Sequence, residues 1–241
     1  MGNNYEEVKK FAEQSLGEMP QVIELLFKLD EGAAMEQFNQ NNLLYLGRTS
    51  LSLKTRVLIA MSVALANGPK ESAMIHFKLA KRFGIEHAEI LDAIRATKMA
   101  LMSSTLDSLD QLLETYVSNE DREAEMHKTQ LLLENLKGEA GLIPDRVLKA
   151  SQFSEELVKE HLREKKAMLK PSKLSQKEVY AVALAVSISI RDKDCQAVYL
   201  SQFKKTGGTK QEAEDILTTT RFLVGNRAFV NGIDILQNMT K

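Results

Sequence analysis

Two segments of the chain are apolar on nearly all sides. They are TRVLIAMSVALA (55–66) and EVYAVALAVSIS (178–189). Segments this long and this uniformly apolar are typical of helices buried in the middle of a domain. The longest apolar run, 57–66, has ten residues, which is too few to span a bilayer. No alternating run of apolar and polar residues bounded by turn pairs occurs, so no strands are predicted and an all-α fold is expected.

Polar residues mark where a second helix of each half begins and ends. Two pairs have the spacing of a capping box: Ser175 with Glu178, and Thr209 with Glu212. Between them a helix is predicted over 192–205, ended by the glycines at 207 and 208, because glycine tolerates the left-handed conformation that closes helices. The corresponding helix of the first half is predicted to start near Pro69, a favoured first position, and to end at Gly84.

The chain is an internal duplication. Residues 51–97 match residues 174–220 at a constant offset of 123 without a gap, and farther upstream the offset becomes 124. Two units are therefore predicted, 1–117 and 118–241, joined near the charged segment SNEDREAE (118–125). The matched pairs that carry the repeat include Leu51 with Leu174, Ala60 with Ala183, Gly84 with Gly207, Asp92 with Asp215, and Pro20 with Pro144.

Composition narrows the classes of function. Charged residues make up 27% of the chain and the net charge is −1, so no basic excess favours nucleic acid or an anionic membrane. Aromatic residues make up 6% and Trp is absent, which argues against base-stacking surfaces. A single cysteine excludes an intrachain disulfide, and the first residues show no signal peptide, so a cytoplasmic location is expected.

Both halves resemble the carboxymuconolactone decarboxylase family, which includes the alkylhydroperoxidase D-like thiol proteins. The resemblance covers roughly 35–110 and 158–235 and is carried by an LSxKxR-type helix start, an apolar helix, a short helix ending in glycine, and the following GxxxxE pattern. It implies two tandem alkylhydroperoxidase D-like units related by a pseudo-two-fold axis. It also implies a homo-oligomer, by analogy a trimer of two-unit chains.

The thiol-active branch of the family has a Glu on the apolar helix and Cys-x-x-Cys-x-x-x-His on the next. Counting back eight residues from Gly84, the His position of the first unit is His76, which matches. The other three positions hold different residues: Val57 for Glu, Pro69 for the first Cys and Ser72 for the second. The first unit thus keeps only the histidine.

The second unit keeps only a cysteine. Counting back from Gly207, Cys195 occupies the second Cys position, while the remaining positions hold Tyr180, Asp192 and Tyr199. Peroxide chemistry requires a thiolate and a resolving thiol, and the chain has no second cysteine. Tyr199 can donate a hydrogen bond but cannot act as a base near neutral pH. Cys195 is therefore either a reactive thiol or a small buried side chain.

His76 has three interpretations. Ser72 lies one turn before it on the same helix face, as in a nucleophile–base pair. The decarboxylase branch of the family keeps a His at this position with acidic residues shortly before it, and Glu71 lies five positions upstream, so His76 can also be a proton donor or acceptor. The third interpretation is a histidine packed at a helix interface.

The remaining polar segments predict no further site. His127 and His161 are predicted on polar helical surface, and the charged segment 159–173 is interpreted as a solvated helix face, with a surface for an acidic partner as the alternative. No metal site, no cofactor and no contact with nucleic acid or membrane is predicted, whereas a small-molecule ligand is compatible with the family.

Three hypotheses follow for the function. The first is a peroxidase- or oxidoreductase-like protein acting through Cys195. The second is a cysteine-independent, decarboxylase-like lyase acting through His76. The third is a non-catalytic binding or structural homologue. Auxiliary roles are assigned to Ser72, Glu71 and Tyr199.

Overall fold

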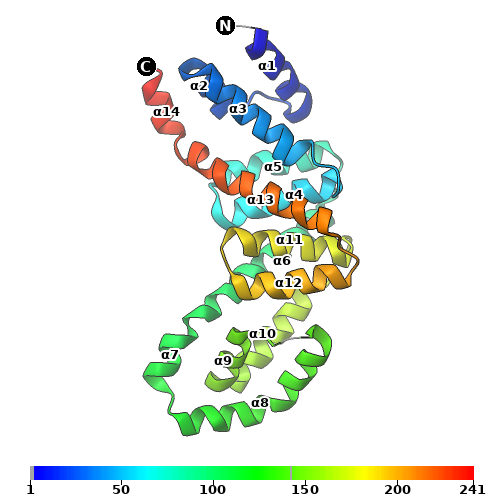
Figure 1. Ribbon diagram of the computed structural model, residues 1–241, viewed down its shortest axis with the longest axis vertical. Coiled ribbons are helices and arrows are strands. Elements are labelled where there is room, and N and C mark those ends of the chain that lie inside the picture. Colours follow the sequence, from blue (N-terminus) through cyan, green and yellow to red (C-terminus); the bar gives the residue numbers. More distant parts are fainter. Residues whose placement is uncertain (1–2, 142) are drawn as a thin grey trace. The chain divides into compact units, whose positions relative to one another are not determined.

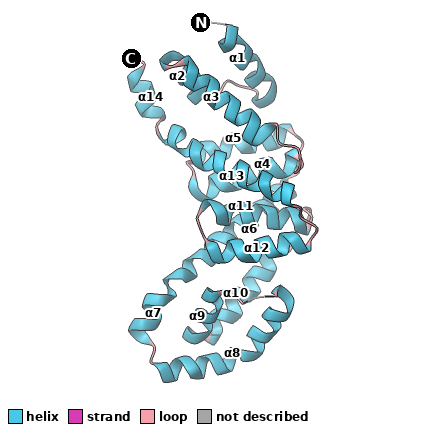
Figure 2. Ribbon diagram, in the orientation of Figure 1, coloured by secondary structure: helices cyan, strands magenta, loops and turns pink. Residues whose placement is uncertain are grey.

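The computed structural model describes residues 3–141 and 143–241, and within them the regular structure is helical, without strands (Figures 1 and 2). The predicted all-α fold is thus confirmed. Contacts divide the chain into two compact units, 1–90 with 209–241, and 91–208. Helix α6 (His87–Ser104) belongs to the first unit in its first turn and to the second beyond it.

The first unit contains the N-terminal helices, a π-helical turn and the two C-terminal helices. The central helix α4 is buried throughout 55–64, and both α5 and α13 pack against it. The elements of this unit are α1 (Asn3–Leu16), α2 (Gln21–Leu29), α3 (Glu31–Asn41), the π-helix η1 (Asn42–Leu46), α4 (Leu53–Asn67), α5 (Lys70–Arg82), α13 (Lys210–Asn231) and α14 (Ile233–Met239).

The second unit repeats this plan around α11, which is buried throughout 181–187 and packs on α12. A further cluster of buried apolar residues joins α8, α9 and α10. Besides α6, the elements are the 3₁₀-helix η2 (Thr105–Ser108), α7 (Leu109–Tyr116), α8 (Asn119–Ala140), α9 (Asp145–Phe153), α10 (Glu155–Met168), α11 (Gln176–Ser189) and α12 (Lys193–Lys205).

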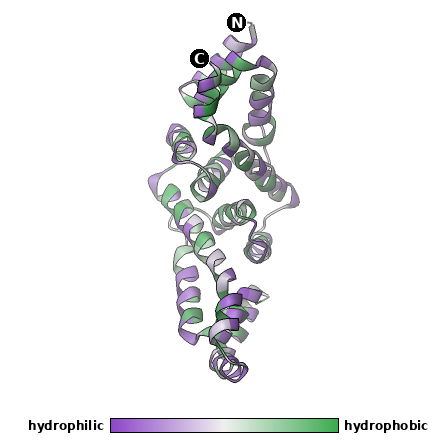
Figure 3. Cartoon of the chain, turned by 90° about the vertical axis from the view of Figure 1, so that its left-hand side faces the viewer, coloured by the Kyte–Doolittle hydropathy of each residue, from purple (hydrophilic) through white to green (hydrophobic). Residues whose placement is uncertain are grey.

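The helix limits follow the predicted signals. Both capping boxes form, at Ser175 before α11 and at Thr209 before α13. Gly84 and Gly207, which follow α5 and α12, have φ of 69° and 87°, a conformation that only glycine adopts easily. Most helices carry both hydrophobic and hydrophilic residues (Figure 3), as expected when each buries one face.

The compact units and the sequence repeats are divided at different places. The predicted segments 1–117 and 118–241 describe the duplication along the sequence. The compact units instead place α13, from the second repeat, on α4 of the first. The central helix of the first unit is therefore covered by a helix from the other copy.

Two buried carboxylates at equivalent positions of the repeat fix this arrangement. Asp215 of α13 accepts hydrogen bonds from the Leu51 backbone N–H (2.9 Å) and from Arg48 Nε (2.7 Å). Asp92 of α6 accepts from the backbone N–H groups of the segment before α11: Ser172 (2.8 Å), Lys173 (2.8 Å) and Leu174 (3.1 Å). Each carboxylate thus holds the chain that enters an apolar helix.

We expect Asp92→Asn to reduce the free energy of unfolding by about 1–3 kcal/mol, because an amide replaces an ionised acceptor of several backbone N–H groups. Burial alone raises the Asp92 pKa, but the N–H groups of Lys173, Leu174 and Ser172 outweigh it and the pKa is lowered. This stabilisation is complete above the pKa of an unfolded Asp, about 3.9, and is lost as the pH falls through the lower folded-state pKa.

Urea unfolding at pH 7 and at pH 3 measures both effects of Asp92→Asn. The exposed Asp234→Asn is the matched control and should cost less than about 0.5 kcal/mol. A cost for Asp92→Asn at pH 7 no larger than that of the control contradicts the role given to this carboxylate.

Candidate functional site

In the first unit, α5 buries Ser72 and His76 on one face. His76 Nδ1 lies 3.4 Å from the hydroxyl of Tyr45, and the two rings meet edge to face with centroids 5.6 Å apart. Burial lowers the pKa of His76 to about 4, so the imidazole is neutral near pH 7. His76 is thus a buried, neutral histidine packed against a tyrosine. This supports the interpretation of a histidine packed at a helix interface more than the interpretation of a proton donor.

His76 lines a small cavity of about 110 Å³ with largely apolar walls. Gln37 and Asn226, which also line it, are hydrogen-bonded to each other at 2.7 Å. No charged side chain of the described residues lines this cavity. Glu71 is exposed and lines a separate surface hollow beside Lys70 and Lys78, so the structure does not bring the predicted acidic auxiliary to His76.

In the second unit, Cys195 lies in the first turn of α12 and is only 3% exposed. Its Sγ is 3.5 Å from Nη1 of Arg146 on α9. Burial, followed by the nearby Asp192 carboxylate, raises the pKa of the thiol to about 12, although Lys165 and Arg146 oppose the shift. The thiol is therefore protonated at neutral pH and is not a ready nucleophile.

Asp192 replaces the first cysteine of the family motif and has a structural role. Its carboxylate caps α12 by accepting from the Cys195 N–H at 2.9 Å, and it forms a buried two-point ion pair with Arg146, with Nη1–Oδ2 at 2.7 Å. Arg146 Nη1 also donates to the Ser103 carbonyl oxygen at 2.8 Å. At the position of the first cysteine of the motif, this chain therefore has an ion pair.

Tyr199, at the histidine position of the motif, is fully buried. Its hydroxyl and that of Ser103 are buried without a hydrogen-bond partner among the described residues. Burial and the nearby Cys195 raise the pKa of Tyr199, while the neighbouring Ser103 opposes the rise. Lys165 Nζ lies 5.3 Å from the centroid of the Tyr199 ring, in cation–π geometry.

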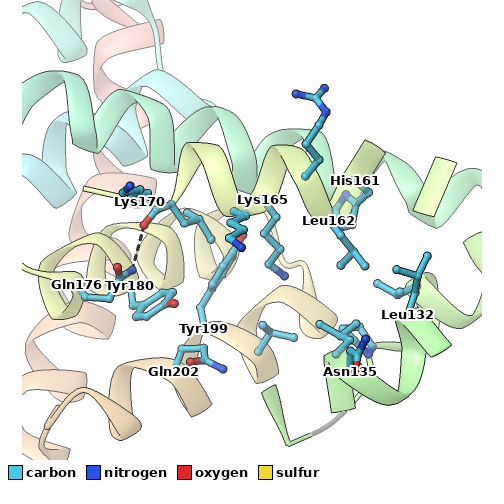
Figure 4. Close-up of a pocket in the computed structure, with 17 residues that line it drawn as sticks. Leu132, Asn135, His161, Leu162, Lys165, Lys170, Gln176, Tyr180, Tyr199 and Gln202 are labelled. Carbon is cyan, nitrogen blue, oxygen red and sulfur yellow. Dashed lines mark hydrogen bonds between the residues drawn. The ribbon is translucent and has the colours of Figure 1, made fainter. Parts of the chain in front are cut away.

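A pocket of about 660 Å³ opens beside these residues, between α8, α9, α10, α11 and α12 (Figure 4). Two tyrosines at motif positions, Tyr180 and Tyr199, form part of its wall. No carboxylate of the described residues lines it. Its basic side chains all come from α10 and the residues directly after it: His161, Arg163, Lys165, Lys166 and Lys170.

The structure corrects the interpretation of 159–173 as a solvated helix face and of His161 as a surface residue. His161 is buried, and Val158, Leu162, Lys165 and Leu169 share its side of the helix. Their spacing of three or four residues is the signal of an amphipathic helix, and it could have identified this face from the sequence. The many charged residues of the segment concealed this spacing.

The charge of the Lys165 ammonium group is balanced by little negative charge. Among the described residues it forms no ion pair, and its one contact of polar character is with the Tyr199 ring. Burial, with a contribution from Arg146, lowers its pKa, against opposing effects of Cys195 and Asp192. The pKa of His161 is lowered to about 4 by burial, then by Lys165 and Arg146. His161 is therefore neutral near pH 7, so the positive charge on the inner wall comes from the protonated form of Lys165, which an anion would stabilise.

The pocket and the His76 cavity occupy equivalent places in the two repeats. The first unit has Gln37 and Asn41 where the second has His161 and Lys165, so one cavity is neutral and the other cationic. The further equivalent lining pairs are Pro20 with Pro144, Ile23 with Val147, Ile75 with Val198, His76 with Tyr199, and Leu79 with Gln202.

The change of offset between the repeats has a structural cause. The N-caps of α3 and α10, Asp30 and Ser154, are 124 residues apart, whereas those of α4 and α11, Ser52 and Ser175, are 123 apart. The first unit accommodates its additional residue in the π-helix Asn42–Leu46, because a π-helix closes its hydrogen bonds over five residues instead of four.

Other kinds of site are not found in the part of the chain that the structure describes. No group of three or more His, Cys, Asp or Glu side chains is placed to hold a metal ion. None of the described helices combines the length and the apolar character needed to cross a bilayer.

The chain belongs to the carboxymuconolactone decarboxylase family. The family model matches residues 30–108 and 157–238, once in each repeat, and together these ranges cover more than half of the chain. The resemblance noted in the sequence and its tandem character are thus confirmed.

A solved structure from Burkholderia xenovorans, described as a "putative gamma-carboxymuconolactone decarboxylase subunit", has a similar fold. Its TM-score is 0.75 at 14% sequence identity, over 97% of this chain and 96% of that one. At this identity the likeness shows the fold alone. No curated protein matches the sequence.

Proposed function

We propose that the second unit binds a small organic anion in the pocket between Tyr180 and Tyr199, with Lys165 as the principal cationic contact. The observation that carries this proposal is a 660 Å³ pocket lined by basic side chains and by no carboxylate of the described residues. Pockets of this volume accommodate ordinary metabolites. The family name and the description of the Burkholderia protein both refer to a carboxymuconolactone, which is itself a carboxylate.

The thiol hypothesis receives little support from the geometry. Cys195 is buried, its pKa is raised to about 12, and Asp192 of the motif is engaged by Arg146. A peroxidase mechanism requires an accessible thiolate and a resolving partner. An oxidoreductase role would need a rearrangement of α12 to expose the thiol, and a resolving thiol from another molecule, because the chain has one cysteine.

The lyase hypothesis centred on His76 is also weakly supported. Among the described residues, no cationic side chain lines its cavity of about 110 Å³ to hold a carboxylate, and Glu71 does not line it either. The organic-anion pocket instead lies in the second unit, where Tyr180 and Tyr199 stand at motif positions. A homo-oligomer and a cytoplasmic location stay predictions.

Isothermal titration calorimetry with cis,cis-muconate, a six-carbon dicarboxylate, tests the proposal. We expect saturable binding that weakens with added salt, because charge attraction contributes to it. The neutral dimethyl ester should bind to the wild type at least about tenfold more weakly than the dianion does. The dianion should bind to Lys165→Met at least about tenfold more weakly than to the wild type. Removing one charge of a buried contact costs well over 1.4 kcal/mol.

Lys98→Met is the matched control. Lys98 is exposed on α6 and does not line the pocket, so this variant should bind as the wild type does. Equal affinity for the dianion and the ester, or unchanged affinity in Lys165→Met, contradicts the proposal.

A further inference from the structure

We propose that Lys165 is a reactive amine that condenses with the carbonyl group of a small oxo acid held in this pocket. The proposal rests on the anion site proposed above and adds a substrate class and a chemical step to it. Lys165 Nζ attacks the carbonyl carbon, protons pass from nitrogen to oxygen, and the oxygen leaves as water, so that a C=N bond replaces the C=O bond. No metal, oxidant or reductant takes part in this step.

The position of Lys165 is the first reason. Figure 4 shows its side chain extending from α10 toward Tyr199 of α12, within the pocket. It forms no ion pair among the described residues, so no carboxylate of the protein competes with a ligand for the amine. Lys165 is half-buried, and a lysine that is only structural usually has such a partner when part of it is taken out of solvent.

In the empty pocket the surroundings of Lys165 raise the share of the neutral amine that the reaction requires, whereas a bound anion stabilises the ammonium form. The titratable groups near it are Arg146 on α9, His161 on its own helix, and Asp192, Cys195 and Tyr199 on α12. Burial and the Arg146 charge lower its pKa, and together they outweigh the opposing effects of Cys195 and of Asp192, whose carboxylate is already paired with Arg146. A lysine lowered in this way is a nucleophile nearer to neutral pH than an exposed lysine.

The rest of the pocket supplies the groups that an oxo acid needs. Lys170 and Gln176 line the side where α10 leads into α11 (Figure 4). The Gln176 amide nitrogen donates to the Leu169 carbonyl oxygen at 3.0 Å, so Lys170 is the group on this side that would receive a carboxylate. Burial raises the pKa of Tyr180, so that its hydroxyl stays a proton donor for the carbonyl oxygen. The equivalent cavity of the first unit has Asn41 at the lysine position and cannot form an imine.

Reductive trapping tests the proposal. The full chain is incubated with pyruvate or 2-oxoglutarate and sodium cyanoborohydride near pH 7, digested, and mapped by mass spectrometry. We expect one peptide, the one containing Lys165, to gain the mass of the acid less one oxygen atom, at least about tenfold faster than the exposed Lys98. Acetone, which has a carbonyl but no carboxylate, should react much more slowly at Lys165.

The variants separate this inference from the anion site. Lys165→Arg keeps a positive charge but has no amine that can form the imine, so it should lose the adduct, whereas Lys98→Met should keep both binding and adduct. Binding of 2-oxoglutarate to the wild type without trapping at Lys165 overturns the imine and leaves the anion site standing. Absence of both binding and trapping overturns both. Competition of trapping by cis,cis-muconate in the wild-type chain provides a readout that does not depend on the folding of any variant.

Discussion

Arg146→Met is expected to lower the free energy of unfolding by about 3–5 kcal/mol, because it leaves the buried Asp192 carboxylate without its counter-charge. The side chains of Arg146 and Asp192 are 5% and 1% exposed, and their ion pair joins α9 to the start of α12. Methionine fills most of the space of the arginine stem. The loss of free energy of unfolding therefore comes from the removed charge and its hydrogen bonds more than from a cavity. Urea unfolding at pH 7 measures it.

The double variant Arg146→Met/Asp192→Asn should recover part of this loss, since the asparagine removes the unpaired charge and can still cap α12. Lys149→Met on the same helix is the control. Lys149 is partly exposed and pairs with Asp145 and Asp110, so its replacement should cost less than about 1 kcal/mol. If Arg146→Met costs no more than Lys149→Met, the ion pair is not what holds α12 in place.

The second large effect is expected in the reactivity of Cys195. With its pKa raised to about 12, the fraction present as thiolate at pH 7 falls roughly a thousandfold below that of an ordinary cysteine of pKa about 8.5. We therefore expect iodoacetamide to alkylate the native chain at least about a hundredfold more slowly than free cysteine.

The same chain unfolded in urea is the internal control for Cys195. Burial and the Asp192 charge are then lost, and the thiol should react at the ordinary rate. Cys195→Ala should bind the organic anion as the wild type does, because Cys195 does not line the pocket. A native thiol that reacts as fast as free cysteine, or faster, would restore the peroxidase hypothesis.

The sequence predicts the parts of the fold that local chemistry determines. The apolar helices α4 and α11, the capping boxes at Ser175 and Thr209, and the glycine endings at Gly84 and Gly207 each depend on a few neighbouring residues. The duplication was equally visible, because equivalent helices require equivalent signals. The sequence gives no local signal that α13 covers α4 in the first unit, since the contact joins segments more than 140 residues apart.

The sequence predicts only half of the candidate site, because tertiary contacts determine the rest. Cys195 and Tyr199 are identified from the motif, but the pKa of the thiol is raised chiefly by burial, which depends on tertiary packing that the motif does not show. The sequence does not identify Lys165, because a charged side chain is expected to face solvent. Burial of a lysine stem against Tyr199 is a tertiary property, and only the apolar spacing of Val158 and Leu169 on the same helix hinted at it.

The central claim is that the functional pocket of this chain is the cationic one of the second unit, and that it holds an organic anion. A crystal structure of the wild-type chain with cis,cis-muconate tests it most directly. The account predicts the dianion between Tyr180 and Tyr199, with a carboxylate at Lys165, and an unmodified Cys195. A ligand bound instead in the His76 cavity, or at the Cys195 sulfur, would contradict it.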